Sequence, residues 1–178
     1  MAGSAAALLL TKQLKLIQQA KDLPGISCGL LSNNIFTWEV MFMISDDNKY
    51  YGGGNFTAHL AFPQNYPYYP PTLTFRTPIP FHPNIYPPWA PNPGELCISI
   101  LHPPIDDPYG HENASERWSS VQTPESILVS VVSLMFSPSD ESPANVEAAV
   151  LWREEQTTAN KEFKRRCRRG VRESLGED

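Results

Sequence analysis

The sequence predicts an α+β fold, in which an N-terminal helix precedes an antiparallel meander sheet, an irregular active-site segment and C-terminal helices. Apolar residues recur first at helical spacing, then at every second position of short segments, and finally at helical spacing again. Fourteen of the 18 prolines lie between positions 63 and 108, which predicts stiff, irregular backbone in the centre of the chain. The length of 178 residues suits one domain, which we place at 1–178.

The first predicted element is a helix over 5–21, which the sequence DLPG at 22–25 ends. Its apolar face comprises Leu10, Leu14 and Ile17. Alternating apolar residues then predict strands over 35–44, 55–62 and 72–75. Because the connections between these three strands are too short for crossover helices, we expect an antiparallel meander.

Helices return after the proline-rich centre. Thr123 and Pro124 form an N-cap and N1 pair, and apolar residues continue at helical spacing behind them. Ser142 and Pro143 repeat this signal and predict a helix that runs to about residue 152. The last predicted helix covers about 157–174 and places Cys167 on an apolar stripe.

Charge is distributed unevenly along the chain. The formal net charge is −5, but residues 1–160 carry seven basic and 15 acidic side chains, a net of −8. The other seven basic residues are Lys161, Lys164, Arg165, Arg166, Arg168, Arg169 and Arg172. One basic helix on an acidic protein is a poor footprint for nucleic acid. We therefore expect a solvated helix face or a docking surface for an acidic partner, and no nucleic acid.

The cysteines indicate a reducing compartment. Cys28, Cys97 and Cys167 are odd in number and far apart, which argues against a disulfide framework, and no C-x-x-C pair suggests zinc. The N-terminal apolar run has no preceding basic region, and no run approaches about 18 apolar residues. We expect no metal, no signal peptide, no membrane insertion, and a cytoplasmic or nuclear location.

Cys97 is the candidate nucleophile, because it lies where the loop NPGEL enters the apolar run ISIL. A small buried hydrophobe is the alternative role for this thiol. Asn84 lies on a loop stiffened by proline, and its amide is a suitable donor to an oxyanion. A cysteine hydrolase would pair Cys97 with His82 or His102, with Asn84 orienting the ring. Papain-like nucleophiles begin a helix, however, and their sequence signature is absent.

Several motifs together resemble the ubiquitin-conjugating enzymes. FPQNYPYYPPTLTF precedes HPNIY and CISILHPP, and ERWSSVQTPESILVSVVSLM and SPSDESPANVEAAVLW follow. The resemblance covers about residues 8–174, with the motifs in the family's order. It implies that Cys97 accepts ubiquitin as a thioester from an activating enzyme and passes it to a lysine. Thioester exchange between thiols of similar pKa needs no dedicated histidine, so we expect none beside Cys97.

The resemblance also implies roles for other residues. Asn84 matches the asparagine proposed to stabilise the oxyanion or to hold the loop that does. Ser142 occupies the position of a group that helps the attacking lysine lose its proton, and an N-cap role is its alternative. The implied partners are ubiquitin, the activating enzyme, a ubiquitin ligase and protein substrates. No cofactor is expected, because the activating enzyme consumes the ATP.

A long segment after Cys97, at about 102–121, resembles the acidic insertion of the conjugating enzymes that build polyubiquitin chains for degradation. Its acidic residues are Asp106, Asp107, Glu112 and Glu116. By position, Tyr68, Ser120 and Val121 would contact the ligase. A catalytically weak domain that only binds ubiquitin or ligases is the alternative function. The segment between Asn84 and Cys97 is several residues longer than usual, which leaves open whether its PPWAPNP sequence bulges outward or covers the thiol.

Overall fold

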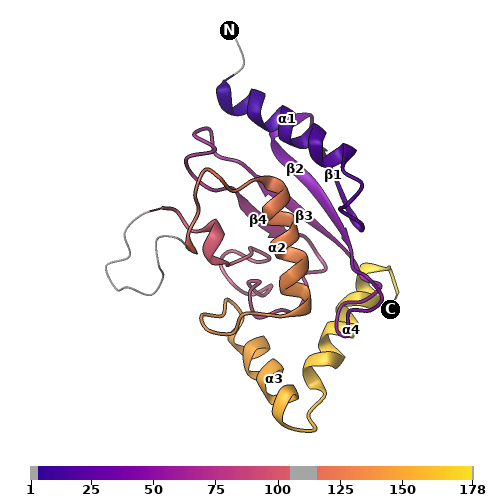
Figure 1. Cartoon of the computed structure of the whole chain (residues 1–178). Coiled ribbons are helices and arrows are strands. Elements are labelled where there is room, and N and C mark those ends of the chain that lie inside the picture. The colour runs from indigo at the N-terminus through magenta and orange to yellow at the C-terminus, as the bar shows by residue number, and fades with distance from the viewer. Residues whose placement is uncertain (1–3, 105–115, 178) are drawn as a thin grey trace.

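The computed structural model describes residues 4–104 and 116–177, and it confirms the predicted α+β class. The described chain forms α1 (Ala5–Gln19), β1 (Ile26–Leu31), β2 (Asn34–Met43), β3 (Asn55–Ala61), β4 (Thr72–Phe75), a 3₁₀ turn (Ser99–Leu101), α2 (Pro124–Phe136), α3 (Val146–Thr157) and α4 (Glu162–Ser174). Figure 1 shows α2 crossing the sheet, α1 beside β1 and β2, and α3 and α4 at the opposite end of the molecule.

The sheet is an antiparallel meander of order β1-β2-β3-β4, with one strand more than the sequence predicts. The missed strand is β1, which pairs with β2 through a two-residue turn at Ser32 and Asn33. Both turn residues have positive φ, 52° and 56°, as this tight hairpin requires. The strand lacks the strict alternation of an amphipathic strand, because β1 lies at the sheet edge and no residue in it is fully buried.

The core forms between the sheet and α2, and the predicted alternation accounts for its sheet side. Trp38, Val40 and Phe42 of β2 and Ala58 and Leu60 of β3 are all fully buried. The buried residues of α2 that complete this layer are Ile127, Leu128, Val131 and Met135. The helix begins as predicted, since Thr123 accepts a hydrogen bond from the Ser126 N–H and Pro124 takes the first helical position.

The boundaries of α3 and α4 differ most from the prediction. α3 begins at Val146, because the side chain of Asn145 accepts from the Ala148 N–H at 3.0 Å and its own N–H donates to the Pro83 carbonyl. Ser142 is therefore not the N-cap, and it lies on the loop before the helix. α3 runs on to residue 157, and α4 starts at 162 rather than 157, because Asn160 accepts from the Glu162 N–H at 2.9 Å and starts a new helix.

Candidate active site

Cys97 is held beside Asn84 by the backbone. The Cys97 N–H donates to the Asn84 carbonyl at 2.8 Å, and the preceding Leu96 N–H donates to the Leu73 carbonyl of β4 at the same distance. Cys97 itself is half-buried. The ISIL run that follows is not a core strand, because residues 99–101 form a 3₁₀ turn in which only Leu101 is buried. The sulfur thus sits at the surface end of a fixed segment.

The extra residues between Asn84 and Cys97 form a closed loop that projects outward. Tyr86 and Glu95 close its base, since the Tyr86 N–H donates to the Glu95 carbonyl at 3.0 Å. Gly94 completes the closure with a bond to the Tyr86 carbonyl at 2.8 Å. The tip residue Trp89 is 67% exposed and lines a separate cavity with Arg166 and other residues of α4. The loop therefore leaves the Asn84–Cys97 pairing intact.

The side chain of Asn84 holds the segment that follows α2. Its Nδ2 donates to the Ser139 carbonyl at 2.8 Å, and its Oδ1 accepts from the Ser139 N–H at 3.0 Å. Asn84 is buried at 3% exposure, so these two bonds replace water on both ends of the amide. Of the two roles that the sequence left open, this geometry favours that of holding the loop.

His82 has a structural role and does not contact the thiol. Its Nδ1 accepts from the Asn84 N–H at 2.9 Å, so its Nε2 carries the proton and donates to the Leu134 carbonyl at 2.8 Å. Complete burial lowers the pKa of His82 to about 4, and the bond to Leu134 opposes this shift only partly. The ring is therefore neutral at physiological pH and locks the turn that carries Asn84.

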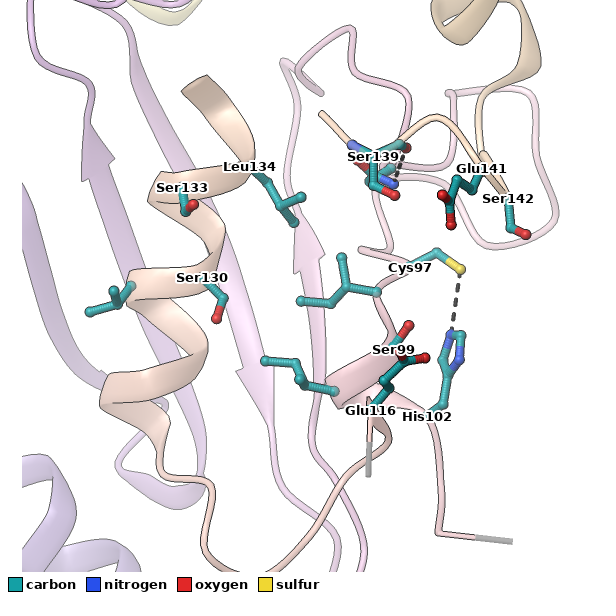
Figure 2. A pocket seen from close by; sticks show the side chains of 14 residues that line it. Cys97, Ser99, His102, Glu116, Ser130, Ser133, Leu134, Ser139, Glu141 and Ser142 are labelled. Carbon is teal, nitrogen blue, oxygen red and sulfur yellow. Dashed lines mark hydrogen bonds between the residues drawn. The ribbon is translucent and has the colours of Figure 1, made fainter. Parts of the chain in front are cut away.

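His102 lies against the thiol, contrary to the expectation of no histidine there. Its Nε2 is 3.6 Å from the Cys97 Sγ, and Figure 2 shows the sulfur and the ring pointing toward one another. The 3₁₀ turn between them folds the chain back, so a spacing of five residues brings the two side chains together. The hydrolase arrangement is still incomplete, because the amide of Asn84 bonds to Ser139 rather than to this ring.

Cys97 opens onto a cavity of about 540 Å³ between α2 and the segment after it. Asn84, Ser142 and Glu116 line this cavity together with Cys97. In Figure 2, Glu141 and Ser142 lie on the side of the sulfur away from His102. The hydroxyl groups of Ser130 and Ser133 on α2 complete the wall of this cavity. The predicted residues Asp106, Asp107 and Glu112 fall outside the described residues.

The three residues predicted to contact a ligase lie on the surface. Tyr68 is 72% exposed and Val121 is 82% exposed, with Ser120 exposed beside it. The indole Nε1 of Trp118 donates to the Pro67 carbonyl at 2.8 Å and so ties their two loops together. The hydroxyl of Tyr66 donates to the Gln13 side chain of α1 at 2.9 Å. Two exposed loops and α1 thus meet at one end of the molecule.

The other two cysteines lack the features of a nucleophile. Burial raises the pKa of Cys28 to about 11 and is the main cause that raises that of Cys167 to about 12. Both therefore stay protonated at neutral pH. Within residues 4–104 and 116–177 no group of three His, Cys, Asp or Glu side chains is placed to hold a metal ion. No helix in this described part is long and apolar enough to cross a membrane.

Comparisons with known proteins find similar sequences and a similar structure. The family described as "Ubiquitin-conjugating enzyme" matches residues 9–167. Ubiquitin-conjugating enzyme E2 15 of Schizosaccharomyces pombe is 52% identical, over 98% of both chains. Ubiquitin-conjugating enzyme E2 G2 of Homo sapiens is 42% identical, over 99% of both chains. The structure of human ubiquitin-conjugating enzyme E2 G1 superposes with a TM-score of 0.59 at 39% identity and covers 75% of this chain and 97% of that one.

Proposed function

Because this chain belongs to the ubiquitin-conjugating enzyme family, we propose that it carries ubiquitin as a thioester on Cys97 and transfers it to lysine side chains. The observation that carries the proposal is the position of Cys97 at the mouth of the 540 Å³ cavity, next to Asn84 and Ser142. The Cys97 thiolate attacks the thioester carbonyl on the activating enzyme, whose own cysteine leaves as a thiolate. A lysine amine then attacks the new thioester, loses a proton and displaces the Cys97 thiolate.

The geometry assigns different tasks to the groups around the sulfur. Asn84 holds Ser139, so the segment with Glu141 and Ser142 stays against the cavity. The Ser142 hydroxyl is exposed and is not engaged as a helix cap, which leaves it available to the attacking amine. His102 is within hydrogen-bonding distance of Cys97 and supports its thiolate, which attacks in the first step and leaves in the second.

We further propose that the chain builds polyubiquitin for degradation, with the acidic segment after Cys97 positioning the acceptor lysine. Glu116 supports this because it lines the Cys97 cavity. The segment carries three further negative charges in the sequence, those of Asp106, Asp107 and Glu112. Deleting residues 104–113 should slow chain formation while Cys97 still loads. Equal loss of chain formation and loading would refute this role.

A ubiquitin ligase is proposed to dock on the surface that α1 and the two exposed loops share. This surface presents Val121 and Tyr68, which are the two most exposed large apolar side chains of the described residues. Exposed apolar and aromatic side chains of this kind are enriched at protein interfaces. The bond from Trp118 to Pro67 fixes the spacing between the two loops, so the surface is preformed.

A loading assay tests the proposed function. The protein is incubated with ubiquitin, activating enzyme and ATP, and the products are separated with and without thiol. A thiol-sensitive adduct is expected that Cys97→Ala abolishes and that Cys97→Ser converts into a thiol-resistant oxyester. Cys28→Ser is the matched control and should load normally, since burial keeps that thiol protonated. No adduct in the wild type, with ubiquitin binding intact, would instead support the weak, binding-only domain.

A further inference from the structure

A second, smaller cavity reaches Cys97 from the side of the extra loop. It measures about 150 Å³, and its lining includes Tyr86, Asn92 and Glu95 of that loop together with Cys97 and His102. The 540 Å³ cavity does not include the three loop residues. The sulfur therefore stands between two separate cavities, and a thioester formed on it has access from both.

The loop fixes Glu95 at the wall of the small cavity. The backbone of Glu95 pairs with that of Tyr86, and the Asn92 Nδ2 donates to one carboxylate oxygen of Glu95 at 3.1 Å. Gly94, just before it, has a φ of +82°, and a Cβ there would lie 2.1 Å from the Phe75 carbonyl oxygen. Only glycine fits this close approach, so Gly94 packs directly against the end of β4.

Tyr86 links the carboxylate to the sulfur. The negative charge of a Cys97 thiolate is the largest cause that raises the pKa of Tyr86, and burial and the charge of Glu95 add to it. One phenol thus lies within electrostatic reach of both groups. No lysine or arginine is among the described residues that line this cavity, so its field favours a cation.

We propose that acceptor lysines approach through the small cavity as well as past Ser142, and that the Glu95 carboxylate attracts their ammonium group to the thioester on Cys97. The inference rests on the proposed function and adds a binding site for the second substrate. The ammonium first loses a proton to water. The free amine then attacks the carbonyl and forms the C–N bond, the nitrogen loses a second proton to water, the C–S bond breaks, and Cys97 leaves as a thiolate.

The test measures single-turnover discharge of preloaded enzyme to free lysine over a range of lysine concentrations. Glu95→Gln keeps an oxygen for the Asn92 amide and removes only the charge. We expect the KM for lysine to rise about two- to fivefold, as for a solvent-accessible ion pair, with kcat little changed. The rise should shrink at 1 M salt, where charges are screened. Glu177→Gln, at an exposed site just beyond the C-terminal end of α4, controls for net charge.

Hydroxylamine, which is uncharged at neutral pH, separates attraction of charge from a structural role. Glu95→Gln should discharge to hydroxylamine as fast as the wild type does. An equal loss with both nucleophiles, or an unchanged KM for lysine, overturns the inference. Glu95→Lys should raise the KM further, and no further rise would also count against it. Failure of the wild type to load would refute the proposed function itself, whereas normal loading with an unchanged KM refutes only the role of Glu95.

Discussion

Replacing Asn84 by alanine tests whether this side chain holds the loop after α2. The change removes two hydrogen bonds to the backbone of Ser139, of 2.8 and 3.0 Å, from a side chain that is only 3% exposed. At about 1 kcal/mol for each bond, Asn84→Ala should lower the free energy of unfolding by about 2 kcal/mol. For a domain of this length, that loss corresponds to a fall in Tm of about 4–8 °C.

Two further variants sharpen this test. Asn84→Asp keeps the oxygen that accepts from the Ser139 N–H but loses the donor to the Ser139 carbonyl. A loss of stability between those of the wild type and Asn84→Ala would show that repulsion between the new carboxylate and this carbonyl is small. Asn145→Ala is the matched control, because it removes a buried N-cap outside the Cys97 cavity and should cost about 1 kcal/mol. This control should keep the rate of lysine discharge.

The assays are urea denaturation and single-turnover discharge of the ubiquitin thioester to lysine. A holding role predicts that Asn84→Ala loses both stability and discharge rate. A role confined to the oxyanion predicts a fall in rate of about 100- to 1,000-fold with normal stability. An unchanged denaturation midpoint together with slow discharge would therefore refute the reasoning.

Three other predictions concern the pH dependence of stability, the thiol and the ligase surface. Because His82 has a folded pKa of about 4 and an ordinary value of about 6.5, its contribution of about 3 kcal/mol is complete above pH 6.5 and is lost as the pH falls toward 4. Urea denaturation at several pH values gives the free energy of unfolding as a function of pH. In His82→Gln this free energy should change less between pH 6.5 and 4 than in the wild type, and an equal change in both proteins would contradict the prediction. His102→Gln should slow loading about fivefold at pH 7, from one lost hydrogen bond, and less at pH 9, where thiols ionise unaided. An equal loss of loading rate at pH 7 and pH 9 would argue against a role of His102 in stabilising the Cys97 thiolate. Val121→Asp should reduce ligase-stimulated discharge more than ligase-free discharge, and equal effects would place the ligase elsewhere.

Local patterns in the sequence account for most of the fold. The alternation of apolar residues located β2, β3 and β4, and the Thr123–Pro124 pair located the start of α2. The sequence did not predict the edge strand β1, because this strand has no fully buried residue and so lacks the apolar alternation. The start of α3 was misplaced because two start signals compete within four residues, and a long-range bond from Asn145 to Pro83 selects the second.

The sequence by itself predicted which thiol acts, because the motifs around Cys97 and Asn84 are adjacent in the chain and need no folding to be read. Only the tertiary structure decided what surrounds that thiol. The contact between His102 and Cys97 depends on a 3₁₀ turn. The hydrogen bonds from Asn84 to Ser139 join residues 55 positions apart, and the outward course of the extra loop depends on the backbone bonds that close its base. Such contacts result from packing of distant segments, and a local pattern carries no record of them.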